Sequence, residues 1–157
     1  MPTITEALVT EHAVFGVVFD QIESTLPKAG SAQGVKLLAT VVEGMLSKHG
    51  ETEAHLAYSA LDHVLEEKGR LNRLHQDHRE VDERFKRVHR AKDLATAKRL
   101  LKKALAVTRE HFRREEDIVF PFLERVLRSQ TVESLGESWM SSHAAPARSL
   151  VRNRVSA

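Results

Sequence analysis

No cysteine occurs among the 157 residues of this sequence. Its absence excludes disulfide bonds, thiolate metal ligands and cysteine nucleophiles together. A metal ion bound by this chain must therefore be held by nitrogen and oxygen ligands. The alternation of apolar and polar residues that is typical of β-strands is also nearly absent, and helix-forming residues dominate throughout. The sequence therefore predicts an all-α fold.

Long apolar runs and a strong charge imbalance are missing as well. The longest run, Ala13 to Phe19, is far too short to cross a bilayer, and no charged-then-apolar leader opens the chain. The formal net charge of +2 is too small to argue for a nucleic-acid partner. We therefore expect neither a membrane nor a nucleic acid as partner, and a cytoplasmic location. No protein partner is indicated.

Helix-breaking residues divide the chain at four places: Pro27 to Ser31, Gly69, His89 to Asp93, and Ser129. Between them lie four long segments with apolar residues at helical spacing. Four amphipathic helices with short links predict an up-down-up-down four-helix bundle over residues 1–128. Residues 129–157 are expected to form a short fifth helix or a tail, packed on the bundle or partly disordered.

Several residues mark the ends of these helices. Thr3 and Glu6 have the spacing of a capping box at the start of the first helix. The second helix is expected to begin after Ser31, and Asp93 is a candidate N-cap for the fourth. Pro121 removes a backbone donor, so the fourth helix is expected to bend near its end.

Each apolar stripe contains a histidine at a core-facing position, namely His12, His49, His78 and His111. In the second and fourth stripes a glutamate follows four residues later, as Glu53 and Glu115. Residues four apart on a helix share one face, with about 5–6 Å between their Cβ atoms. Each of these two pairs can therefore direct a ring nitrogen and a carboxylate toward one point.

The two halves of the chain also resemble each other. His12 precedes His49 by 37 residues, and His78 precedes His111 by 33. Two similar helical hairpins packed together would bring the four histidines and two glutamates into the centre of the bundle. Burial of two unpartnered carboxylates is unfavourable, because each loses its hydration and the two repel each other. A pair of divalent metal ions would compensate both, since such ions accept imidazole nitrogen and carboxylate oxygen.

This pattern resembles the hemerythrin-like family, also called the HHE cation-binding domain, over roughly residues 4–128. The matching motifs are Glu11-His12, His49 with Glu53, Asp77-His78-Arg79, and His111-Phe-Arg-Arg-Glu-Glu-Asp-Ile-Val-Phe-Pro121. One His-x-x-x-Glu motif would be weak evidence. Two of them, with single histidines on the other two helices, form a fairly specific pattern.

The resemblance implies a four-helix bundle that holds a non-haem di-iron centre with a bridging oxo or hydroxo group. By position in the sequence, one iron would be held by His12 and His49, the other by His78 and His111, and both by Glu53 and Glu115. Members of the family include dioxygen carriers and sensors of oxygen, redox state or iron. The implied ligand is therefore a small diatomic molecule or peroxide.

Two positions differ from the pattern of the oxygen-carrying hemerythrins. Those proteins place two histidines four apart in the third helix, and an aspartate five residues after the fourth-helix histidine. Here Leu74 lies four residues before His78, and Glu116 takes the place of the aspartate. His75 lies three residues before His78, at the edge of the stripe, and is a possible seventh ligand. Glu116 is expected at the surface or behind the ligands, and the open metal positions suit peroxide, nitric oxide or redox chemistry.

Neighbouring residues are expected to shape the site. Tyr58 and Phe120 lie about 180° around their helices from His49 and His111, so they are expected to pack elsewhere unless the helix is distorted. Thr108, one turn before His111, could place a hydroxyl near an open metal position. The expected apolar shell consists of Phe15, Met45, Leu74, Phe85 and Ile118.

The same six residues are compatible with three kinds of protein. The leading interpretation is a di-iron protein that binds or responds to dioxygen, peroxide, nitric oxide, redox state or iron. The second is a di-iron enzyme with peroxidase, catalase-like or nitric-oxide chemistry, and the sequence does not separate these two. The third is a structural bundle that binds zinc, although zinc prefers four ligands. A ferritin-like site is less favoured, because no Glu-x-x-His motif occurs in the chain.

Overall fold

The computed structural model describes residues 1–64 and 72–143, with the side chains of residues 64 and 72–75 also outside the description. The expectations for Gly69, Leu74 and His75 therefore fall on side chains or residues that lie outside it. The α-helices are α1 (Ile4–Thr25), α2 (Ala32–Glu53), α3 (Ser59–Val64), α4 (Asn72–His89), α5 (Leu94–Arg114), α6 (Phe120–Val126) and α7 (Ser129–His143). A 3₁₀-helix, η1 (Leu26–Lys28), and two π-helices, η2 (Ala54–Tyr58) and η3 (Glu115–Val119), complete the set.

The helix starts follow the capping signals in the sequence. Thr3 accepts a hydrogen bond from the backbone N–H of Glu6, whose carboxylate accepts from the backbone N–H of Thr3, so the predicted capping box is confirmed. Ser31 caps α2, and Asp93 caps α5 by accepting from the N–H of Thr96. These bonds satisfy backbone donors that a helix leaves free in its first turn.

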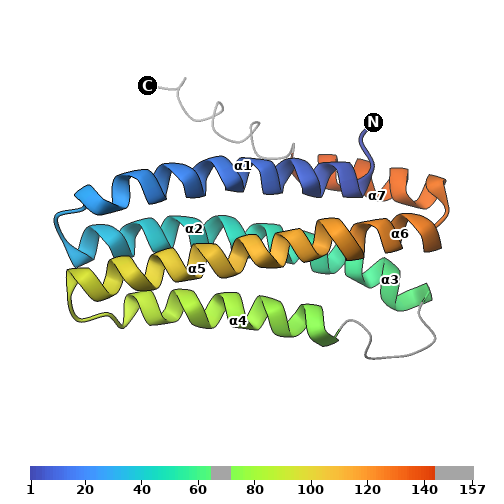
Figure 1. Ribbon diagram of the computed structural model, residues 1–157. Helices are drawn as coiled ribbons and strands as arrows, with labels where there is room; N and C mark the ends of the chain where they lie inside the picture. The colour runs from blue at the N-terminus through green and yellow to red at the C-terminus, as the bar shows by residue number, and fades with distance from the viewer. Residues whose placement is uncertain (65–71, 144–157) are drawn as a thin grey trace, which may run out of the picture.

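The fold is all-α, as predicted, and no strand occurs in the described part of the chain. Figure 1 shows α1, α2, α4 and α5 lying side by side, with α3 continuing the line of α2 and α6 that of α5. α7 lies against the N-terminal half of α1 (Figure 1) and contacts η2. Within the described residues no helix is long and apolar enough to span a bilayer.

Two apolar clusters fill the bundle on either side of the histidine-bearing turns. The larger includes Phe15 and Phe85, and the smaller includes Leu8 and Leu123. Because Leu8 and Phe15 belong to different clusters, His12, which lies between them on α1, falls at the boundary. The polar candidate residues therefore occupy a layer that is enclosed by apolar side chains above and below.

The two π-helices begin at the two candidate glutamates: η2 directly after Glu53, and η3 with Glu115 as its first residue. A π-helix carries one more residue per hydrogen-bonded turn than an α-helix, so it shifts which later residues face the core. Ile118, predicted in the apolar shell, is 64% exposed, whereas Val119 is 7% exposed and Leu123 fully buried. The prediction for Ile118 is therefore wrong. Likewise, beyond η2 Leu61 is fully buried, whereas Ala60, its neighbour in the sequence, is only half-buried.

Pro121 accounts for part of this irregularity. In a continuous α-helix, a proline at this position could not donate to the carbonyl of Asp117, and its ring would crowd that carbonyl. The wider turn of η3 ends at Val119, and α6 begins at Phe120. Pro121 therefore falls in the first turn of α6, where no such donor is required. The sequence predicted a bend near Pro121, and the structure places a change of helix type there.

Candidate metal centre

All six predicted ligands meet between α1, α2, α4 and the α5–η3 segment. His12, His49 and His111 are each only 4% exposed, and Glu53 and Glu115 are fully buried. The side chain of His78 is 27% exposed, which makes it the most accessible of the six. The layer of polar side chains predicted from the helical stripes is therefore present.

The ligand atoms form two groups that share one carboxylate. One group contains His12, His49 and Glu115, and the other contains Glu53, His78, His111 and Glu115. Within each group, one nitrogen or oxygen atom from every residue lies within 4.8 Å of all the others. Each group has the size and donor types of a site for one metal ion.

Glu115 spans the two groups through its separate oxygen atoms. Its Oε2 lies 3.5 Å from Nε2 of His12. Its Oε1 lies 2.9 Å from Nε2 of His111 and 3.7 Å from Nε2 of His78. A carboxylate placed in this way can give one oxygen to each of two metal ions.

Glu53 lies between histidines of both groups as well. Its Oε2 is 3.3 Å from Nε2 of His78 and 3.9 Å from Nε2 of His49. Nε2 of His49 in turn lies 3.2 Å from Nε2 of His12. The Nε2 atoms of all four histidines therefore converge on the two buried carboxylates.

Several of these buried atoms have no hydrogen-bond partner among the described residues. They are both oxygens of Glu53, both ring nitrogens of His111 and Oε2 of Glu115. Buried polar groups in folded proteins are nearly always hydrogen-bonded, because an unpaired group keeps the full cost of its lost hydration. Cations in the site would supply the missing interactions of the carboxylate oxygens and of Nε2 of His111. The residues present therefore fit a bound pair of metal ions.

A comparison with known protein families gives an independent result. The model of the hemerythrin HHE cation-binding domain matches residues 3–123. The chain belongs to this family. The resemblance read from the motifs is thereby confirmed, and the polar layer described above falls within the matched region of this hemerythrin-like chain. The curated proteins and the solved structures that were searched gave no significant match.

Without metal, protonation of the site's own side chains compensates the negative charge in the hemerythrin-like site. Burial opposes a charge on His78, but the neighbouring carboxylates of Glu115 and Glu53 outweigh it and raise the pKa of His78 to about 10. Burial also opposes ionisation of Glu115, yet His111 and His78 together hold its pKa below its usual value. Burial and the neighbouring charge of Glu115 raise the pKa of Glu53. The metal-free site therefore balances its carboxylates with imidazolium.

Two further carboxylates orient the histidines of the first group. Nδ1 of His12 lies 2.8 Å from Glu116, and Nδ1 of His49 lies 2.8 Å from Glu11. A carboxylate accepts a hydrogen bond from Nδ1–H, which leaves the lone pair of Nε2 directed into the site. Glu116 therefore lies behind a ligand, one of the two places expected for it. The role of Glu11, whose other oxygen lies 3.4 Å from His143, was not predicted.

Tyr58 is the main residue that sequence reasoning placed wrongly. Its position in a regular helix would turn it away from His49, but η2 brings it inward, where it is 1% exposed. Its hydroxyl donates a short hydrogen bond to Oε1 of Glu115. Burial and the charges of Glu53 and Glu115 raise the pKa of Tyr58, so the hydroxyl keeps its proton. Phe120 turns inward in the same way and stacks near His12, with 5.6 Å between ring centroids.

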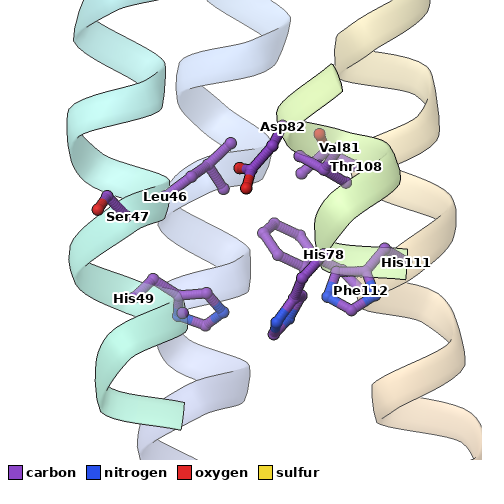
Figure 2. A pocket seen from close by; sticks show the side chains of 10 residues that line it. Leu46, Ser47, His49, His78, Val81, Asp82, Thr108, His111 and Phe112 are labelled. Carbon is purple, nitrogen blue, oxygen red and sulfur yellow. The ribbon is translucent and has the colours of Figure 1, made fainter. Parts of the chain in front are cut away.

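One side of the site opens into a pocket of about 220 Å³ that is lined by His49, His78, His111 and Thr108. Figure 2 shows these side chains around the pocket. Thr108 lines this pocket, is fully buried and donates to the carbonyl of Ala104; the position of its hydroxyl near an open metal position stays a prediction. Metal ligation by the six residues stays a prediction, and His75, the possible seventh ligand, has a side chain outside the described part.

Proposed function

We propose that this protein binds two iron ions and uses them to bind, or respond to, dioxygen or a related small ligand such as peroxide or nitric oxide. The observation that supports this most is the pair of three- and four-residue groups that share Glu115. The family relationship supports cation binding in general. The number and identity of the ions, and the ligand, are parts of the proposal.

The residues would divide between the two ions as follows. His12 and His49 would hold one ion, His78 and His111 would hold the other, and Glu53 and Glu115 would be shared by both, as would an oxo or hydroxo group. The helices that carry these residues are proposed to follow the up-down-up-down order predicted from their short links. When bound, the iron pair would supply the redox chemistry and the open position for a small ligand.

The protein's own residues would control that chemistry in three ways. The apolar clusters on both sides of the site limit access of water, because the carboxylates are fully buried. Glu11 and Glu116 fix the rings of His49 and His12 so that Nε2 points inward. Tyr58 holds a proton against Oε1 of Glu115, within the layer where a ligand would be bound.

The Tyr58 hydroxyl also favours a second candidate function. An enzyme that reduces peroxide must deliver protons to the oxygen atoms that it separates. The phenol of Tyr58 is hydrogen-bonded to Glu115 in the buried layer, which places its hydroxyl where such a proton is required. A di-iron enzyme with peroxidase or catalase-like activity is therefore the alternative to a carrier or sensor.

Metal analysis and rapid mixing test these proposals. Protein purified from iron-replete cells should contain two irons per chain, whereas a single zinc per chain would favour the structural alternative and contradict the proposal. Stopped-flow mixing of the reduced iron form with oxygen should then give a coloured adduct that releases oxygen when the pressure is lowered, if the protein is a carrier. Rapid consumption of many equivalents of peroxide would instead identify an enzyme.

A further inference from the structure

The pocket beside the candidate metal centre has a definite position in the bundle. It lies between α2 and α4, with residues of α5 also in its lining. In Figure 2 His49 stands on one side, while His78 and His111 stand on the other. These three histidines come from both groups of ligand atoms. The pocket therefore reaches both proposed metal positions from one direction.

A second pocket, of about 180 Å³, lies on the α1–α5 side and approaches the site less closely. It is lined by His12 and Glu116, and these two residues are joined through Nδ1 of the imidazole. Nε2 of His12, by contrast, lies next to His49 and Glu115. Phe112 lines both pockets and stacks on His12 with 3.9 Å between ring centroids, so it separates them. The second pocket therefore meets the outer edge of one ligand.

We propose that the pocket between α2 and α4 is the route and binding chamber for a small, uncharged ligand, with the hydroxyl of Thr108 as a hydrogen-bond acceptor. This inference rests on the proposed function, because the ligand is the one that the metal pair would bind. It adds a point of entry, a selection by charge and a residue that contacts the ligand. Hydrogen peroxide is the molecule that fits these requirements most fully.

The size and lining of the pocket support this assignment. A volume of about 220 Å³ exceeds the roughly 30 Å³ that one water molecule occupies in the liquid, so a peroxide molecule enters with room to spare. Leu46, Val81 and Phe112 give it apolar walls. Thr108 uses its proton on the carbonyl of Ala104, and its remaining lone pair can accept a hydrogen bond from a peroxide O–H.

Asp82, the one acidic side chain among the described lining residues, favours neutral molecules over anions. Asp82 is exposed, and the part of the lining that the structure describes contains no lysine or arginine. Its charge lowers the local concentration of anions such as azide and leaves that of peroxide unchanged. The effect should weaken as added salt screens the charge.

Three glycines allow a matched test, because a Cβ added at Gly50, Gly44 or Gly16 meets nothing within 4 Å. Gly50 lines the pocket between α2 and α4, Gly16 lines the second pocket, and Gly44 lies on α2 outside both. Gly50→Leu should slow association of azide and of peroxide with the iron-loaded protein by roughly tenfold, which corresponds to about 1.4 kcal/mol of added barrier. Gly44→Leu and Gly16→Leu should react like the parent.

Because Gly50 is next to His49 in the sequence, Gly50→Leu could slow the ligands by displacing that histidine, and a second variant that narrows the pocket tests for this. Ser47 is exposed and lines the same pocket, so Ser47→Trp can narrow it without altering the core. It should slow both ligands as Gly50→Leu does. Equal association rates in the parent, Gly50→Leu and Ser47→Trp would overturn the proposal. Slower association in Gly16→Leu, with Gly50→Leu and Ser47→Trp like the parent, would overturn it as well.

Charge selection is tested with Asp82→Asn. At low salt this variant should accelerate azide association by up to about fivefold and leave peroxide unchanged, and the gain should vanish at high salt. An equal change for both ligands, or none for azide, would contradict the selection by charge. The iron content of every variant is measured alongside. A parent without two irons contradicts the proposed function and the pocket with it, whereas two irons with unaltered rates contradict the pocket alone.

Discussion

Glu53 provides a sharp test of the metal centre, because its substitution should have opposite effects with and without metal. The side chain is fully buried, and neither oxygen has a hydrogen-bond partner among the described residues. Burial and the charge of Glu115 both raise its pKa, which shows that an ionised Glu53 is disfavoured in the metal-free protein. Replacement of Glu53 by leucine should therefore not destabilise that form.

The size of the change in the free energy of unfolding follows from the charges that remain after the substitution. In the metal-free parent, the imidazolium of His78 lies between Glu53 and Glu115, and Glu53→Leu leaves it beside Glu115 alone, 3.7 Å away. Apolar replacement of buried ionic groups is commonly neutral or stabilising by up to about 4 kcal/mol, so a gain of zero to about 3 kcal/mol is expected. In the parent, each ion present at 100 times its dissociation constant adds about 2.7 kcal/mol, and the variant should lose most of this.

Urea denaturation with and without ferrous iron, under anaerobic conditions, measures both effects. Glu51 is exposed on the same helix, so Glu51→Leu is the matched control and should change the free energy of unfolding by less than about 0.5 kcal/mol in either state. The reasoning is refuted if Glu53→Leu lowers the stability of the metal-free protein by more than about 1 kcal/mol while iron still stabilises it as in the parent.

Three further predictions concern neighbouring features. Tyr58→Phe removes a donor to the buried carboxylate of Glu115 and should lower the free energy of unfolding by about 1.5–3 kcal/mol in urea; no change would show that this bond contributes nothing. Gly136→Ala would place a Cβ 2.0 Å from a backbone oxygen of Pro2, so α7 should shift and the fluorescence of its tryptophan should move to longer wavelength; an unaltered spectrum would contradict the close packing. The metal-free protein should be most stable near pH 6.5. Because the pKa of His78 is raised to about 10, its contribution to folding stability is complete below pH 6.5 and is lost as the pH rises through 10. Because the pKa of His12 is lowered to about 3, its contribution is complete above pH 6.5 and is lost as the pH falls toward 3. Urea midpoints that stay constant from pH 4 to 10 would contradict both contributions.

The helices and their stripes could be predicted because local signals agreed with the pattern of burial. Thr3, Ser31 and Asp93 marked helix starts, and the histidines at core-facing positions marked the polar layer. The prediction failed beyond Glu115, where Ile118 proved exposed. A fixed period of 3.6 residues cannot describe a helix that contains a π-turn, and only Pro121 gave a local sign of one.

The site was predictable to the extent that it depends on residues four apart on one helix. The two His-x-x-x-Glu pairs and the single histidines fall together as expected. Tyr58 was missed because its direction is set by η2, and no proline follows that turn as Pro121 follows η3. Glu11 was quoted as part of a motif, but its bond to His49 crosses from α1 to α2, and a contact of that kind depends on how the helices pack.

The central claim is that two cations lie between the same six side chains and share Glu115. Anomalous diffraction at the iron absorption edge, from crystals grown with ferrous iron, tests it most directly. The account predicts two iron peaks, one beside Nε2 of His12 and His49 and the other beside Nε2 of His78 and His111, with Glu115 in contact with both. A single peak that lacks Glu115 as a ligand, or iron bound at the surface with Glu53 and Glu115 still unliganded, would contradict it.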